Sequence, residues 1–145
     1  MQRLADTDLR ALMPGTQLIA RRRGYVHTGI YVGGRRVVHY AGPLKYPRGL
    51  VEETSLEDFG AGRPVYVIHA AIPPARLVEV VRRARSRLGE RSYDLLLNNC
   101  EHFCSWCQTG EARSAQVDRL SRSQRLFVRA VERAVLAVKR ERLAA

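Results

Sequence analysis

The sequence predicts an α+β fold in which an antiparallel sheet packs against helices, and two observations support this class. Between Thr16 and Ala70, runs rich in aromatic and β-branched residues alternate with glycine and proline turns, which is typical of short strands. From Pro73 onward the apolar residues recur at helical spacing instead. Strands that precede helices along the chain favour α+β architecture over a parallel sheet with interleaved helices.

Turn residues divide the first half of the chain into elements. A short helix over Leu4–Met13 is expected to end at Pro14-Gly15. A helical turn over Ser55–Phe59 should come before the last strand. The five expected strands are Thr16–Arg21, Tyr25–Val32, Arg36–Tyr40, Leu50–Glu53 and Val65–Ala70.

Three helices should follow the strands. The first opens at Pro73-Pro74 and ends at Gly89, and it carries an apolar stripe formed by Leu77, Val80, Val81, Ala84 and Leu88. The second begins after Asn98-Asn99, because a short amide side chain accepts the unpaired N–H groups of a first helical turn. The third covers residues 121–143. A single domain over residues 1–145 is long enough to bury its own core.

Composition limits the compartment and the partners. The formal net charge is +11, from 25 Lys and Arg against 14 Asp and Glu, which either keeps the protein soluble or attracts anionic partners. An odd number of cysteines, three in one short stretch, argues against a disulfide framework and for a reducing compartment. Neither a signal peptide nor a membrane-spanning run is evident, so we expect a cytoplasmic protein.

Cys100 is the candidate nucleophile. The expected helix start places it where the positive end of the helix dipole favours a thiolate, so we expect its pKa to be lowered. Cys104 and Cys107 continue a Cys-x3-Cys-x2-Cys spacing that resembles the cluster-binding run of radical SAM enzymes. The chain is too short for their barrel and the spacing suits zinc poorly, so we expect both cysteines in the core and no metal or cofactor.

His27 and His39 are the candidate base and its partner. In the strand Tyr25–Val32, Tyr25, His27 and Gly29 share one face, which makes Tyr25 a candidate substrate-binding residue. The Gly33-Gly34 turn favours a hairpin. We predict a three-residue loop, Val32-Gly33-Gly34, that pairs His27 directly with His39. A thiol, a base and a group that orients the base form a catalytic set, whereas His69 matches no motif.

Three segments resemble the LRAT-like family, which contains lecithin:retinol acyltransferase and related phospholipase/acyltransferases. Its Asn-Cys-Glu-His-Phe signature is similar to Asn99–Phe103, and its two histidine segments are similar to Tyr25–Gly33 and Val37–Tyr40. The resemblance covers roughly Gly15–Gln108. It implies a circularly permuted papain-like (NlpC-type) architecture with Cys100 as nucleophile, His27 as base and His39 as third member. His102 and Glu101 should stabilise the helix start instead. His102 is two positions along the helix from Cys100, and a residue at that spacing faces away from the thiol.

The resemblance implies a thiol-dependent acyl-transfer enzyme, a lipid acyltransferase or phospholipase A type that forms an acyl-Cys100 intermediate from a donor such as a glycerophospholipid. An alternative is an NlpC-like amidase or cysteine peptidase, which shares the catalytic set. A second alternative is a non-catalytic basic binding module. Nucleic acid is not an expected partner, since exposed aromatic residues beside the arginines are sparse.

The last expected helix bears on how the protein would meet a lipid. Arginines surround an apolar stripe on this helix, formed by Leu120, Phe127, Val128, Val131, Ala134, Val135 and Val138. Such a basic amphipathic helix suits peripheral contact with an anionic membrane. The stripe is poor in bulky side chains, however, which favours packing against the domain.

Overall fold

The structure is a computed structural model that describes residues 1–4, 10–23, 25–42, 49–70 and 72–144. Its sheet has the strand order β1-β6-β2-β3-β4-β5, and every pairing is antiparallel. The strands are β1 (Gln2–Arg3), β2 (Gln17–Arg22), β3 (Tyr25–Gly33), β4 (Arg36–Tyr40), β5 (Val51–Ser55) and β6 (Val65–Ile68). The helices are α1 (Leu56–Gly60), α2 (Pro74–Ser86), α3 (Cys100–Thr109), α4 (Ala115–Asp118) and α5 (Arg122–Ala144).

This arrangement confirms the predicted α+β class, while the permuted papain-like detail stays a prediction. The last part of the helix expected over Leu4–Met13 is wrong, because residues 10–13 are turn or irregular, whereas Leu4 has 3₁₀ conformation. Before Leu4, Gln2–Arg3 forms β1 and pairs with β6. Residues 5–9 of that expected helix lie outside the described residues. The sequence also missed α4, which at four residues is too short to show a helical period.

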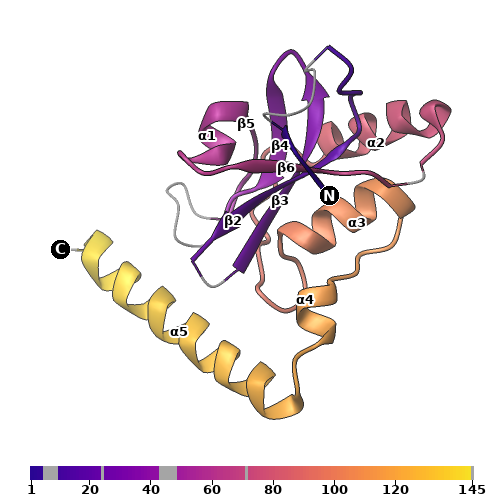
Figure 1. Ribbon diagram of the computed structural model, residues 1–145. Helices are drawn as coiled ribbons and strands as arrows, with labels where there is room; N and C mark the ends of the chain where they lie inside the picture. The colour runs from indigo at the N-terminus through magenta and orange to yellow at the C-terminus, as the bar shows by residue number, and fades with distance from the viewer. Residues whose placement is uncertain (5–9, 24, 43–48, 71, 145) are drawn as a thin grey trace.

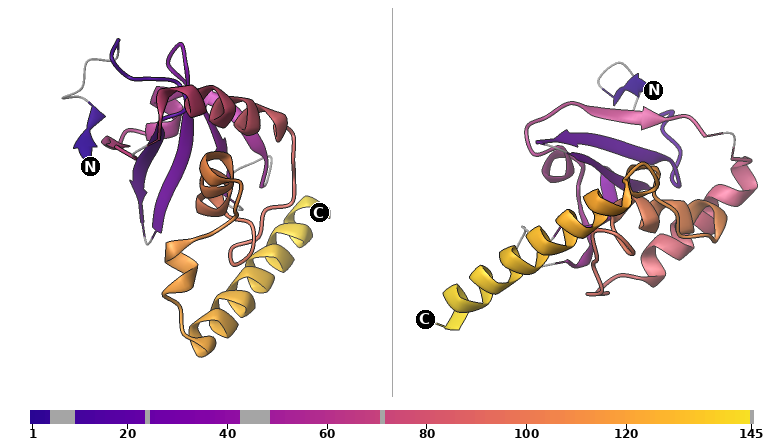
Figure 2. Two further views of the ribbon diagram at one scale, coloured as in Figure 1. Left: turned by 90° about the vertical axis from the view of Figure 1, so that its right-hand side faces the viewer. Right: turned by 90° about the horizontal axis from the view of Figure 1, so that it is seen from below.

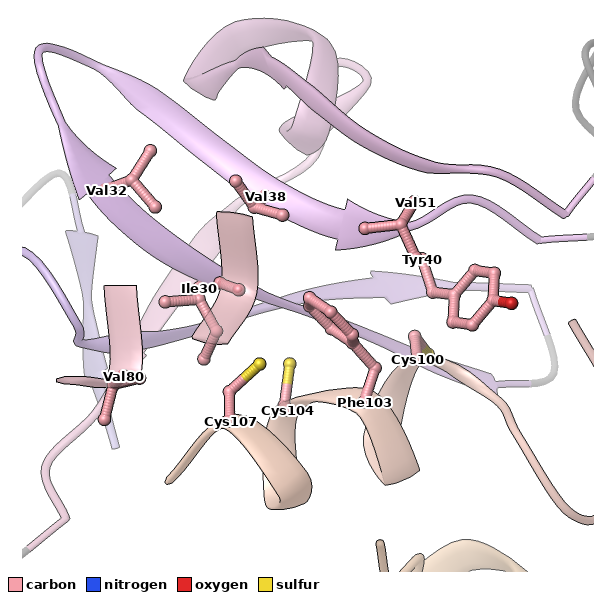
Figure 3. Close-up of a cluster of buried hydrophobic side chains, with 11 residues drawn as sticks. Ile30, Val32, Val38, Tyr40, Val51, Val80, Cys100, Phe103, Cys104 and Cys107 are labelled. Atoms are coloured by element: carbon pink, nitrogen blue, oxygen red, sulfur yellow. The ribbon is translucent and has the colours of Figure 1, made fainter. Parts of the chain in front are cut away.

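Two apolar layers lie on opposite faces of the sheet. Helices α2 and α3 cover one face (Figures 1 and 3), where Ile30, Val38 and Tyr40 pack against Phe103 and Cys104. Cys107 is buried in the same cluster, so the prediction of two core cysteines is confirmed. The second cluster lies on the other face, where side chains of the sheet meet α1: Leu18, Ala20, Tyr31, Val37, Leu56 and Phe59.

The hairpin between β3 and β4 differs from the predicted register. Gly29, not His27, pairs with His39, and the register shifts by one residue between Tyr31 and Gly33. The turn is the two-residue Gly34-Arg35, and both residues have positive φ (57° and 59°), as a type I′ hairpin requires. The bulge before this turn absorbs the extra residue. His27 and His39 still share a face, because His27 lies two residues from Gly29.

Helix α5 stands apart from the sheet and extends beyond it (Figure 2). Its side chains contact the segment that leads into α3: Arg129 forms a 2.6 Å ion pair with Asp94, and Glu132 accepts a hydrogen bond from the Leu95 N–H. Within the described part of the chain, no helix is both long enough and apolar enough to cross a bilayer.

A methyl group at Gly29 should destabilise the fold. Its Cβ would lie 2.7 Å from Val37 Cγ1 and 2.9 Å from Phe59 Cε2, so the buried face must shift. We expect Gly29→Ala to lower the free energy of unfolding by about 1–3 kcal/mol, measured by urea titration. Gly42→Ala is the control, because its Cβ would be no closer than 3.9 Å to Tyr25 Oη. Equal midpoints for the two variants would contradict the expectation.

Candidate active site

The N-terminus of α3 sets the position of the candidate nucleophile. Asn99 is the N-cap, and its side-chain oxygen accepts hydrogen bonds from the backbone N–H groups of Glu101 (2.9 Å) and His102 (3.1 Å). The His102 Nδ1 atom accepts in return from the Asn99 N–H, which completes a capping box. Cys100 is therefore the first helical residue, as predicted, and His102 pins the helix.

Glu101 fixes the loop that follows α3. Its Oε2 atom accepts hydrogen bonds from Ser114 Oγ (2.6 Å), the Gln116 N–H (3.0 Å) and Gln116 Nε2 (3.2 Å). The Gln116 amide then bonds to both backbone groups of Val26, the N–H at 3.2 Å and the carbonyl at 3.4 Å. The same Val26 carbonyl faces Cys100 Sγ at 3.8 Å. Gln116 thus ties the cysteine helix to β3, a role that sequence reasoning missed.

The two candidate histidines form a buried pair on the α1 face of the sheet. The Nε2 atom of His27 lies 3.0 Å from Nδ1 of His39, at hydrogen-bond distance, and the rings meet edge to face. Phe59 contacts both rings, with centroids 5.3 and 5.6 Å away. On its other side, His39 Nε2 lies 3.2 Å from Glu52 Oε1 of β5. Glu52 is a second residue that sequence reasoning missed.

The thiol and the imidazoles come from opposite faces of the sheet and line one pocket near the end of β4. The pairing of β3 with β4 begins at Gly29, so the segment from Tyr25 to Thr28 continues past the end of β4. Helix α3 approaches there from its own face, and Thr28 Oγ1 donates a 2.9 Å hydrogen bond to the Cys100 carbonyl. Cys100, His27 and His39 all line one pocket at this point, together with Ala41 and Gly42.

This pocket has a volume of about 830 Å³ and mostly apolar walls, which suits an organic ligand. Tyr25 lines it and is partly exposed, so the structure brings all four predicted site residues together. One wall is α5, which contributes Phe127, Val128, Val131, Glu132, Val135 and Leu136. The stripe predicted for this helix is therefore only partly right, because Ala134 and Val138 are exposed while Leu136 faces the pocket.

Burial dominates the electrostatics of the thiol. Only 3% of Cys100 is exposed, and this desolvation raises the pKa of its thiol, although the Thr28 backbone and side chain act in the opposite direction. This direction is opposite to the predicted low pKa, because loss of water disfavours the charged thiolate. Burial likewise raises the pKa of Tyr25. In the core, burial raises the pKa of Cys107 to about 12.

Two further features of the sequence, His69 and the possible metal ligands, can be placed in the structure. His69 is exposed, and its Nε2 atom lies 3.2 Å from Gln2 Oε1. In the described ranges of the chain, no group of three or more His, Cys, Asp or Glu side chains is arranged to hold a metal ion. The pocket itself is lined by one thiol and by a pair of imidazoles.

Comparison with known proteins gives consistent matches. A family model described as lecithin retinol acyltransferase matches residues 10–113. The chain is 28% identical to lecithin retinol acyltransferase of Rattus norvegicus, over 84% of this chain and 65% of that protein. It is 30% identical to "Phospholipase A and acyltransferase 1" of Homo sapiens, over 73% of each chain. The match to the rat protein thus spans slightly less than two thirds of its length.

Cys100 should react with a thiol reagent before the other two cysteines, and this reaction should require alkaline rather than acidic pH. Cys100 lines the pocket, so iodoacetamide should modify it before the core residues Cys104 and Cys107. Because burial raises the pKa of its thiol, the modification rate should increase with pH to a midpoint above the ordinary value of about 8.5. Peptide mass spectrometry across a pH series measures this, with Cys100→Ala as control. Rapid modification of Cys100 at mildly acidic pH would contradict it.

Proposed function

The chain belongs to the lecithin retinol acyltransferase family, and from this premise we propose that it is a thiol-dependent acyl-transfer enzyme with a lipid acyl donor. Cys100 is the nucleophile, His27 the general base and His39 the residue that orients the base. The observation that carries the proposal is that Cys100 and a hydrogen-bonded histidine pair line the same pocket. A thiol, a base and an orienting group are the parts that covalent acyl transfer needs.

In the proposed reaction, Cys100 Sγ attacks the ester carbonyl carbon while His27 takes the thiol proton. The tetrahedral intermediate then breaks its bond to the alcohol oxygen, and the imidazolium returns the proton to that oxygen. A lysophospholipid leaves and an acyl-Cys100 thioester remains. His27 next takes a proton from water or from an acceptor hydroxyl or amine, whose attack releases the acyl group and restores the thiol.

The raised pKa of the Cys100 thiol decides when the proton moves. A resting thiolate–imidazolium pair is not favoured in so dry a site, so proton transfer to His27 accompanies attack on the carbonyl. The developing oxyanion forms at the N-terminus of α3, where the helix dipole favours negative charge. Substrate that fills the pocket excludes water further and strengthens this interaction.

The pocket walls support a lipid as donor. Leu95, Leu96, Val117 and Leu120 line the cavity together with apolar residues of α5, and such a lining buries an acyl chain favourably. The partly exposed Tyr25 lies beside the reactive centre, with its ring centroid 6.3 Å from that of His27. A phenol there is placed to contact the polar part of the donor. The relatives include a phospholipase A and acyltransferase, which agrees with this class.

Incubation with phospholipid should produce a covalent acyl-enzyme. Intact mass spectrometry should show Cys100 carrying one acyl group from a glycerophospholipid or an activated ester. Cys100→Ala should abolish the adduct. His27→Gln should slow its formation by roughly 10²–10⁴-fold, because the general base is lost.

His69→Gln is the matched control, since this histidine is exposed directly after the end of β6 and does not line the pocket. An adduct on Cys100 from peptides alone, with none from lipids or esters, would instead favour the amidase or peptidase alternative. No adduct from any donor, in a folded protein, would overturn the proposal.

We further propose that α5 brings the pocket to an anionic membrane surface. Leu126 and Phe127 are 66% and 70% exposed, and Phe127 also borders the pocket, so the pocket opens beside an exposed bulky apolar pair. Arg119, Arg122 and Arg133 are exposed around it. Apolar insertion with surrounding arginines suits an anionic bilayer, and each basic residue near such a surface contributes about 1 kcal/mol.

Liposome co-sedimentation tests this contact. The double variant Leu126→Ser/Phe127→Ser should lower binding to anionic liposomes by roughly tenfold, because it removes the inserting side chains. High salt should release the unmodified protein, since surface charge attraction is screened.

Val78→Ser is the control, because Val78 is 75% exposed on α2 and lies away from the pocket-lining residues. Unchanged binding of the double variant would exclude membrane docking by this part of α5. Equal binding to neutral liposomes would exclude the role of charge.

A further inference from the structure

Glu52 of β5 is placed to act on the histidine pair. It lies directly opposite His39 in the β4–β5 register, so both side chains leave the sheet on the same face. Glu52 Oε1 is 3.2 Å from His39 Nε2, which is an ion-pair distance although the two atoms are not aligned as a hydrogen bond, and the His39 side chain is only 4% exposed. We propose that Glu52 is a positioning residue that fixes the tautomers of His39 and His27. The consequence for rate rests on the proposed function; the tautomers do not.

The first step concerns His39. An ionised carboxylate has no proton to donate, so it favours an imidazole that carries its proton on the near nitrogen. Neutral His39 therefore holds its proton on Nε2, the nitrogen that lies near the negative charge of Glu52. Its Nδ1 atom then has a lone pair and serves as an acceptor.

The second step concerns His27. Its Nε2 atom lies 3.0 Å from that acceptor, so Nε2 must carry the proton for the contact to be a hydrogen bond. The proton on Nε2 leaves a lone pair on Nδ1 of neutral His27. This nitrogen is buried, and the ring lines the pocket that holds Cys100. The lone pair is what a general base needs to take the thiol proton.

The other tautomer of His39 would leave His27 unable to act as a base. With His39 protonated on Nδ1, that nitrogen donates to Nε2 of His27, and neutral His27 then carries its proton on Nδ1. A ring in this tautomer has the same position and the same hydrogen-bond length but no lone pair for the thiol. One carboxylate on β5 thus selects the active form of a histidine on β3, two strands away, through His39 on β4.

The neighbouring Glu53 offers a matched comparison. It lies on the same strand but faces the other side, where it forms ion pairs with Arg36 (3.3 Å) and Arg85 (3.4 Å). Its side chain is about as exposed as that of Glu52, 25% against 20%. The same chemical change at residues 52 and 53 therefore separates the effect on the histidines from a general loss of charge on β5.

Nitrogen-15 NMR of the histidine rings reads the tautomers without any substrate. In the unmodified protein near neutral pH, His39 and His27 should both appear as the Nε2–H form, with assignments from His27→Gln and His39→Gln. Glu52→Gln keeps the shape, but its amide can donate as well as accept. We therefore expect an Nδ1–H population on both rings in Glu52→Gln and no change in Glu53→Gln.

Acylation of Cys100 by an activated ester gives the second readout. Glu52→Gln should lower the acylation rate constant at saturating ester by roughly 10²-fold, with an unchanged half-saturating concentration and urea midpoint. Glu52→Asp should recover part of this loss, and Glu53→Gln should match the unmodified protein. An Nδ1–H form of His39 in the unmodified protein, or unaltered tautomers or rate in Glu52→Gln, would overturn the inference.

The two proposals fail differently. If the unmodified protein shows both Nε2–H tautomers and Glu52→Gln disturbs them, yet no donor acylates Cys100, the proposed function is wrong while the tautomer control by Glu52 stands. If acylation proceeds but the tautomers do not depend on Glu52, the proposed function stands and this inference is wrong.

Discussion

The pairing of Gly29 with His39 across β3 and β4 is the constraint on which the site depends. It places His27 diagonally from His39 on one face, where the two rings reach each other at 3.0 Å. The absence of a side chain at Gly29 is part of the same arrangement, because Phe59, Val37 and the His39 Cβ occupy the space that a methyl group would need. Phe59 then packs on both imidazoles and keeps them dry.

The thiol reaches this pair by a separate route. The Asn99 cap and the His102 capping box begin α3 at Cys100, and the bonds of Gln116 to Val26 hold that helix end against β3. The same close packing that positions the sulfur removes its water and raises the pKa of the thiol. Precise placement and an easily formed thiolate therefore oppose each other here, which is why the proposed mechanism moves the proton during the attack.

Helix α5 has two different sides that together relate the pocket to its surroundings. Val128, Val135 and Leu136 complete the apolar wall, while the exposed Leu126 and Phe127 stand beside arginines at its edge. The Asp94–Arg129 ion pair and the bond from Leu95 to Glu132 connect this helix to the residues just before α3. The residues just before α3 thus connect α5 to the helix that carries Cys100.

Local patterns determined the features whose causes are local. Alternating β-branched residues located β3 and β4, the Asn-Asn pair located the start of α3, and the spacing of Cys104 and Cys107 placed both in the core, because side-chain periodicity and capping act over a few residues. The histidine and cysteine segments also carried the family resemblance that the comparisons support. Only the tertiary structure decided the hairpin register, since positive φ at Gly34 and Arg35 with a bulge before them replaced the predicted loop. It alone revealed Glu52 and Gln116, whose partners His39 and Val26 are 13 and 90 residues away in the sequence. It also changed the expected direction of the Cys100 pKa from lowered to raised, because desolvation depends on the neighbours that folding brings and not on the residues beside it in the chain.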